Sequence, residues 1–121
     1  MPLIRIVLLI ILWSSFLGTA FGQTQLPTKK GIEKLTKQAT KLRESGDFEK
    51  SLLVSRLALR KSIAIHDNVL IAQTYNNVAA NYNDLAEFDK AIFYYNKALN
   101  YANITQNDTI KQRINNNLGN I

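Results

Sequence analysis

The hydrophobic and small residues in the second half of the chain recur at the spacing of α-helices. Within Tyr75–Leu99, steps of three and four place such side chains on one face of each of two helices: Tyr75, Val78, Ala79 and Tyr82, then Ala91, Tyr95 and Ala98. Small Ala79 and Ala91 stand where two helices must approach closely. The pattern predicts two amphipathic helices folded back on each other, and such a pair needs neighbours to bury its remaining apolar faces.

The same periodicity predicts further helices on both sides of this pair. The first four are expected over Lys30 to Ser45, Phe48 to Ile65, Asn68 to about Leu85, and Phe88 to about Ala102. Breaks fall at Gly46, at His66 to Asn68 and at Ala86 to Glu87, with Gly46 expected as a left-handed or open turn residue. Asp47 is expected to cap the second helix, and Asp67 or Asn68 the third. The sequence therefore predicts an all-α protein.

An internal repeat with a period of 40 residues relates these helices. The segment Glu44 to Phe48 aligns with Asp84 to Phe88, and the same shift places Leu35 on Tyr75 and Ala39 on Ala79. A second shift of 40 residues places Asn115–Gly119 on Tyr75–Ala79, so a third copy begins near the end of the sequence.

This arrangement of aromatic, aliphatic and small residues resembles the tetratricopeptide repeat (TPR), in the long-period form found in exported or regulatory bacterial proteins and in kinesin light chains. The resemblance is closest over residues 68–107 and weaker before them, where Gln38, Ser51 and Ser55 replace expected apolar or small residues. It implies a TPR-like helical-hairpin solenoid of about two and a half repeats: residues 32–67 as a degenerate capping repeat, 68–107 as a complete repeat and 108–121 as the first helix of a truncated one. The long period predicts that the second helix of a repeat, or the loop after it, is extended.

The last expected helix has apolar side chains for which the sequence provides no further helix as a cover. A solenoid that stops within a repeat leaves one face uncovered, which costs about 1.5 to 3 kcal/mol for each large side chain left in water. The residues expected on that face are Ile110, Ile114, Leu118 and Ile121. This expectation indicates that the sequence is the front of a longer protein.

The amino terminus has the composition of a targeting segment. Arg5 precedes an apolar run, and small Ala20 and Gly22 stand two residues apart, as in a secretory signal peptide. We expect residues 1–22 to be a signal peptide cleaved before Gln23, residues 23–31 to be a linker, and the protein to be exported to the periplasm or secreted. The alternative is an uncleaved anchor in the inner membrane formed by residues 3–21.

The amino-acid composition excludes several kinds of catalytic and metal-binding site. The chain is 46% hydrophobic and 20% charged, which is typical of a folded domain, and it has no cysteine and a single histidine, His66. Thiolate chemistry, paired-histidine metal sites and phosphate-binding glycine loops are therefore excluded, and we expect no enzyme, no cofactor and no metal. Carboxylates at Asp47 and Glu49, and at Glu87 and Asp89, occupy equivalent turns of two repeats, so we interpret them as helix caps.

Positive charge is concentrated near the start of the helical region. The chain carries a formal net charge of +6, and Lys30, Lys34, Lys37 and Lys41 form a stripe on the first expected helix. We interpret the stripe as a solvent-exposed helix face. The alternative is a surface that contacts anionic lipid headgroups or an acidic peptide. Nucleic acid is not an expected partner of an exported domain.

The resemblance also implies a binding site. In TPR proteins the first helices of successive repeats line a groove that accepts extended peptides, and asparagine suits this role because its amide both donates and accepts hydrogen bonds. The matching candidates here are Lys37, Thr40, Asn76, Asn77, Asn116, Asn117 and Asn120. We therefore expect a non-enzymatic exported scaffold that binds a protein or peptide. The alternative is the extracytoplasmic amino-terminal sensory region of a longer bacterial signalling protein, a histidine kinase or transcriptional regulator with TPR repeats.

Overall fold

The computed structural model describes residues 26–121, which form five α-helices. Their bounds are α2 (Lys29–Glu44), α3 (Phe48–Ala64), α4 (Asn68–Asp84), α5 (Phe88–Thr105) and α6 (Asp108–Gly119). The all-α prediction is confirmed, and the predicted helix bounds agree with the observed ones to within three residues. The expected signal peptide of residues 1–22, its cleavage point and the alternative membrane anchor lie outside the described residues.

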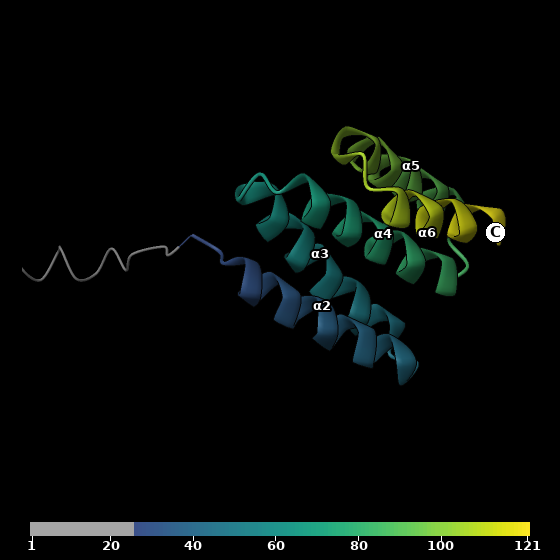
Figure 1. The fold of residues 1–121 in the computed structure, drawn as a ribbon. Helices are drawn as coiled ribbons and strands as arrows, with labels where there is room; N and C mark the ends of the chain where they lie inside the picture. The colour runs from purple at the N-terminus through teal and green to yellow at the C-terminus, as the bar shows by residue number, and fades with distance from the viewer. Residues whose placement is uncertain (1–25) are drawn as a thin grey trace, which may run out of the picture.

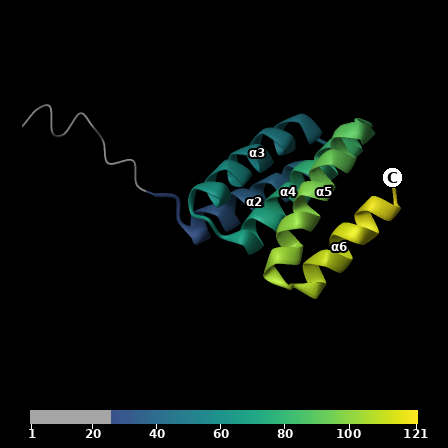
Figure 2. The ribbon, with the colours of Figure 1, turned by 90° about the horizontal axis from the view of Figure 1, so that it is seen from above.

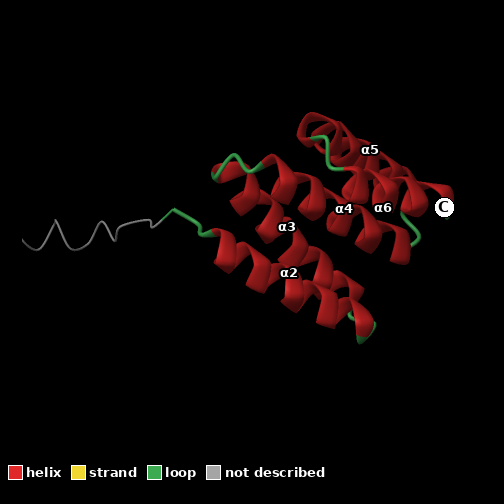
Figure 3. Cartoon of the chain, in the orientation of Figure 1, coloured by secondary structure: helices red, strands yellow, loops and turns green. Residues whose placement is uncertain are grey.

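The helices follow one another in space in the order of the sequence. Figure 1 shows α2 at the lower end, α3 and α4 above it, and α5 at the upper end, with α6 drawn between α4 and α5; each helix packs against the next as in a hairpin. In the view from above, α6 lies beside α5, on the side away from α3 (Figure 2). Between the helices the chain forms only short loops (Figure 3). The helix α4 also contacts α2 and α6, so it touches all four other helices.

The turns between the helices recur every 20 residues. Each contains one residue with positive φ: Gly46 (82°), His66 (54°), Ala86 (59°) and Gln106 (55°). Gly46 therefore takes the left-handed one of the two turn conformations expected for it. Because α3 and α4 each have 17 residues, the extra length of the 40-residue period is shared between the helices. The second helices α3 and α5 have 17 and 18 residues, and the first helices α2 and α4 have 16 and 17, so the added length is not confined to the second helix named in the prediction.

The residue after each left-handed position is the N-cap of the next helix, and most of these residues cap it with a side chain. The Asp47 carboxylate accepts a hydrogen bond from the amide of Lys50 at 3.3 Å, and Asp67, rather than Asn68, accepts one from Leu70 at 3.0 Å. Glu87 was also interpreted as a cap, but its side chain makes no capping bond and pairs with Lys90 instead. A glutamate is one methylene longer than aspartate, and cap positions favour the shorter side chain.

The core is densest between α4 and α5. Small residues predicted at the close approach are completely buried there, including Ala79 on α4 and Ala91 and Ala98 on α5. Alanine has no side chain beyond Cβ, so the two helices can pack closely along their length. Ten of the seventeen residues of α4 are buried, which makes it the central helix of the described chain.

The expected exposure of the apolar face of the last helix was wrong for Ile110 and Ile114. Ile110 is 4% exposed and Ile114 is fully buried, because α6 packs these side chains into the core formed by α4 and α5. Leu118 is half-buried and Ile121 is 40% exposed. Most of the apolar face of α6 is therefore covered by the helices that precede it.

The left-handed turns predict opposite effects for two substitutions. A Cβ at Gly46 would meet no atom within 4 Å, and Ala86 is exposed, so both positions report backbone strain alone. Gly46→Ala should lower the free energy of unfolding by roughly 0.5 to 1 kcal/mol, and Ala86→Gly should raise it by a similar amount. Thermal unfolding followed by circular dichroism measures both. Changes of the same sign would contradict the assigned turn geometry.

Candidate functional site

Two hydrogen-bonded side-chain pairs join helices that are not adjacent in the sequence, and Lys29 of α2 also forms an ion pair at 3.9 Å with Asp67, the N-cap of α4. Arg43 at the end of α2 forms an ion pair with Asp84 at the end of α4, with Nη2 donating to Oδ1 at 3.3 Å. This hydrogen-bonded pairing raises the pKa of the guanidinium. Between α4 and α6, Nδ2 of Asn117 donates to Oδ1 of Asn76 at 2.9 Å.

Both hydrogen-bonded pairs connect residues 41 positions apart, so they repeat at nearly the period of the sequence. The pairs lie at corresponding steps: α2 is joined to α4, and α4 to α6. These three helices therefore run side by side and in the same direction, and together they form one face of the molecule. We call this face the odd-helix face, because α2, α4 and α6 are the first, third and fifth helices of the described chain.

The contacts also show what the predicted site asparagines do. Asn76 is 6% exposed and its amide oxygen is occupied by Asn117, so both serve the contact between α4 and α6. Asn116 and Asn120 are exposed on α6. The side chain of Asn77 remains half-buried at the surface of α4.

Thr40 and Asn77 come together across α2 and α4. They line a cavity of about 20 Å³ with the polar side chains of Arg43, Ser55 and Asn81. Nδ2 of Asn81 donates to Ser55 at 3.2 Å and to the carbonyl of Asn77 at 2.9 Å, while its Oδ1 has no partner within residues 26–121. A cavity of this volume holds about one water molecule, which would satisfy that oxygen.

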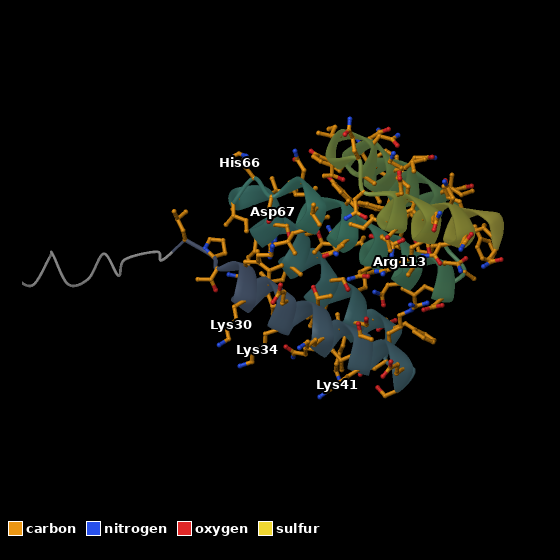
Figure 4. All side chains as sticks on the ribbon, viewed as in Figure 1. Lys30, Lys34, Lys41, His66, Asp67 and Arg113 are labelled. Atoms are coloured by element: carbon orange, nitrogen blue, oxygen red, sulfur yellow. The ribbon has the colours of Figure 1, made fainter. Side chains whose placement is uncertain are left out.

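Lys37 does not line the cavity formed by Thr40 and Asn77. It lines a different surface hollow on α2, together with Lys34 and Lys41. Figure 4 shows Lys30, Lys34 and Lys41 along the edge of α2. The structure therefore associates Lys37 with the lysine stripe predicted from the sequence.

Arg113 and the serines of α3 were not identified from the sequence as residues of the site or of the contacts that support it. Arg113 is exposed on α6, four residues before Asn117, so it lies on the side of α6 that faces α4 (Figure 4). The serines of α3 are buried and bonded between helices: Ser51 donates to the carbonyl of Ala39 at 2.7 Å. Their recurrence on one face of α3, with Ser51 and Ser55 one turn apart, was the available signal.

Other features that would indicate a function are a catalytic histidine, a metal-binding cluster and a membrane-spanning helix. His66 is exposed in a turn, and residues 26–121 contain no cluster of three or more histidine, aspartate or glutamate residues positioned to hold a metal ion. None of the helices α2 to α6 has the length and apolarity needed to cross a membrane.

Comparison of the chain with protein-family models, curated proteins and solved structures found no match. The interpretation of the odd-helix face therefore depends on its own residues. Its supporting observations are the two contacts between residues 41 positions apart and the polar side chains left at the surface beside them.

The bond between Asn76 and Asn117 predicts that alanine substitutions of Asn117 and of its neighbour Asn116 change the free energy of unfolding by different amounts. Asn117→Ala should lower the free energy of unfolding by about 1 to 3 kcal/mol, because it leaves the buried Asn76 amide without its partner. Asn116→Ala, an exposed change on the same helix, should alter it by less than about 0.5 kcal/mol. Urea unfolding measures both variants. Equal effects would mean that the bond does not contribute to stability.

Proposed function

We propose that this chain is an exported, non-enzymatic TPR-like scaffold that binds an extended segment of a partner protein on the odd-helix face. The observation that carries the proposal is the repeated contact between residues 41 positions apart, which aligns α2, α4 and α6. An aligned set of helices offers polar side chains at regular intervals, and an extended peptide presents its main-chain groups at regular intervals as well.

The regular turns support the repeat-array part of the proposal. Left-handed residues recur every 20 positions at Gly46, His66, Ala86 and Gln106, and two helices with their turns complete one 40-residue unit. A stack of equal helical hairpins is the architecture that the sequence resemblance to TPR proteins implies. Two full hairpins, α2 with α3 and α4 with α5, are followed by α6 as the first helix of a third.

The remaining polar residues define the proposed peptide contacts. Asn77, Asn116 and Asn120 keep amides that can both donate to a peptide carbonyl and accept from a peptide amide. Thr40 and Arg113 lie on the same face, and Lys37 adds positive charge at its α2 edge. Asn76 and Asn117 have a supporting role, because their mutual bond fixes α6 against α4.

A peptide selection experiment tests the function. Random linear peptides displayed on phage are selected on the full chain, and the affinity of the best synthetic peptide is measured by calorimetry. Asn77→Ala and Asn120→Ala should each weaken binding by about three- to tenfold, as expected for the loss of one hydrogen bond.

Asn96→Ala, an exposed change on α5 outside the odd-helix face, is the matched control and should leave the affinity unchanged. Equal affinities for the Asn77→Ala, Asn120→Ala and Asn96→Ala variants would contradict the proposed site. Circular dichroism of each variant verifies that the fold is retained.

A further inference from the structure

A second hollow lies on the opposite side of α4 from the odd-helix face. It is a cavity of about 410 Å³, lined by Leu53, Arg56, Leu59 and Arg60 of α3, Tyr75 of α4 and Tyr94 of α5. Tyr75 and Asn77 are two residues apart on α4, so their side chains point about 160° away from each other. We call this hollow the arginine cleft.

The wall of the arginine cleft carries unbalanced positive charge. Arg56 and Arg60 are exposed and one helical turn apart, and neither belongs to any of the five ion pairs formed within residues 26–121. Like charges at this spacing repel each other and destabilise a helix. An anionic group bound between the two guanidinium groups would remove that repulsion and accept several hydrogen bonds at once.

The aromatic side chains that line the cleft, Tyr75 and Tyr94, belong to a row of tyrosine rings in mutual contact. Four tyrosines alternate between α5 and α4, with ring centroids of Tyr101 and Tyr75 at 5.7 Å, Tyr75 and Tyr94 at 6.1 Å, and Tyr94 and Tyr82 at 5.3 Å. We call this row the tyrosine ladder. Burial raises the pKa of Tyr75, so its hydroxyl stays protonated and can donate to an anion.

Exposed apolar side chains lie beside the charged wall. Leu53 is 68% exposed at the cleft, and Phe93, 55% exposed, packs edge-on against Tyr94 with ring centroids at 5.2 Å. A free phosphate ion would leave this apolar surface in water, and a flat bilayer would not fill a concave hollow. A peptide that carries both acidic and apolar side chains matches both parts of the surface.

We propose that the arginine cleft binds an acidic peptide segment of a partner protein. Arg56 and Arg60 hold two carboxylates from alternate residues of an extended chain, and a neighbouring apolar side chain packs on Tyr94 and Leu53. The spacing supports this arrangement, because side chains one helical turn apart are separated by about 5 to 6 Å and alternate side chains of an extended peptide by about 6.6 Å.

Calorimetry with the full chain tests the proposal, with the peptide acetyl-Glu-Ser-Glu-Ser-Phe-amide as the probe. Its two glutamates and its phenylalanine share one face in the extended conformation. The glutamine counterpart, acetyl-Gln-Ser-Gln-Ser-Phe-amide, should bind at least about tenfold more weakly, because it lacks the charge-assisted hydrogen bonds.

Variants assign the binding to the cleft. The double change Arg56→Gln with Arg60→Gln should weaken binding of the acidic peptide by at least about tenfold. Lys34→Gln with Lys41→Gln removes the same charge from the outer edge of α2 and should change the affinity by less than about twofold, since exposed distant charges are screened by salt. Asn77→Ala with Asn120→Ala should leave it unchanged, which separates this site from the odd-helix face.

A charge reversal provides the sharpest check. Arg56→Glu with Arg60→Glu should lose the acidic peptide and bind acetyl-Lys-Ser-Lys-Ser-Phe-amide instead. Equal binding of the glutamate and glutamine peptides, or equal loss in the arginine and lysine double variants, would overturn the proposal. So would absence of binding at about 1 mM peptide, or cleft-dependent binding of inorganic phosphate or phosphatidylserine vesicles without binding of the peptide.

Discussion

The burial of α4 is the constraint on which the rest of the described structure depends. This helix contacts all four others, and ten of its residues are buried, including the polar Thr74, Asn76 and Asn81. A buried polar group without a partner costs about 1 to 3 kcal/mol, so each of these side chains needs a hydrogen bond inside the protein.

Carbonyl groups of α4 and side chains of the neighbouring helices supply those partners. Thr74 lies 3.4 Å from the hydroxyl of Ser62 and donates to the carbonyl of Leu70, and Asn81 donates to Ser55. On the other side, Asn76 accepts from Asn117 of α6. These bonds have directional geometry, so they are satisfied only when α3, α4 and α6 are in one register. Serines that looked like departures from an apolar pattern thus specify the packing of α3 against its neighbours.

The two faces of α4 differ because different side chains face its neighbours. Completely buried alanines bring α4 and α5 close together, while the tyrosine ladder keeps large rings along one edge of the same interface. Tyr75 and Tyr94 of the ladder line the arginine cleft, and the opposite side of α4 contributes Asn77 to the odd-helix face. One central helix therefore supports two surfaces with different chemistry, one rich in amides and one rich in guanidinium and aromatic groups.

The sequence predicted the features that depend on local structure. Helix bounds, the left-handed Gly46, the Asp47 cap and the buried Ala79 and Ala91 all follow from periodicity and from the intrinsic geometry of single residues. Features that depend on which helices meet were not predicted.

The burial of Ile114 required knowledge that α6 folds back onto α4 and α5, and the pairing of Asn76 with Asn117 required the same knowledge. Arg56 and Arg60 were not recognised as site residues, because an arginine on an exposed helix face looks the same in sequence whether or not a tyrosine lies opposite.

Native-state hydrogen exchange of the full chain, followed by NMR residue by residue, tests the central position of α4 most directly. If its buried polar bonds hold the helices in register, the amides of α4 exchange only through global unfolding, while those of α2 and α6 also exchange through smaller openings. Exchange of the Asn76–Asn81 amides at a lower opening free energy than those of α2 or α6 would contradict the account.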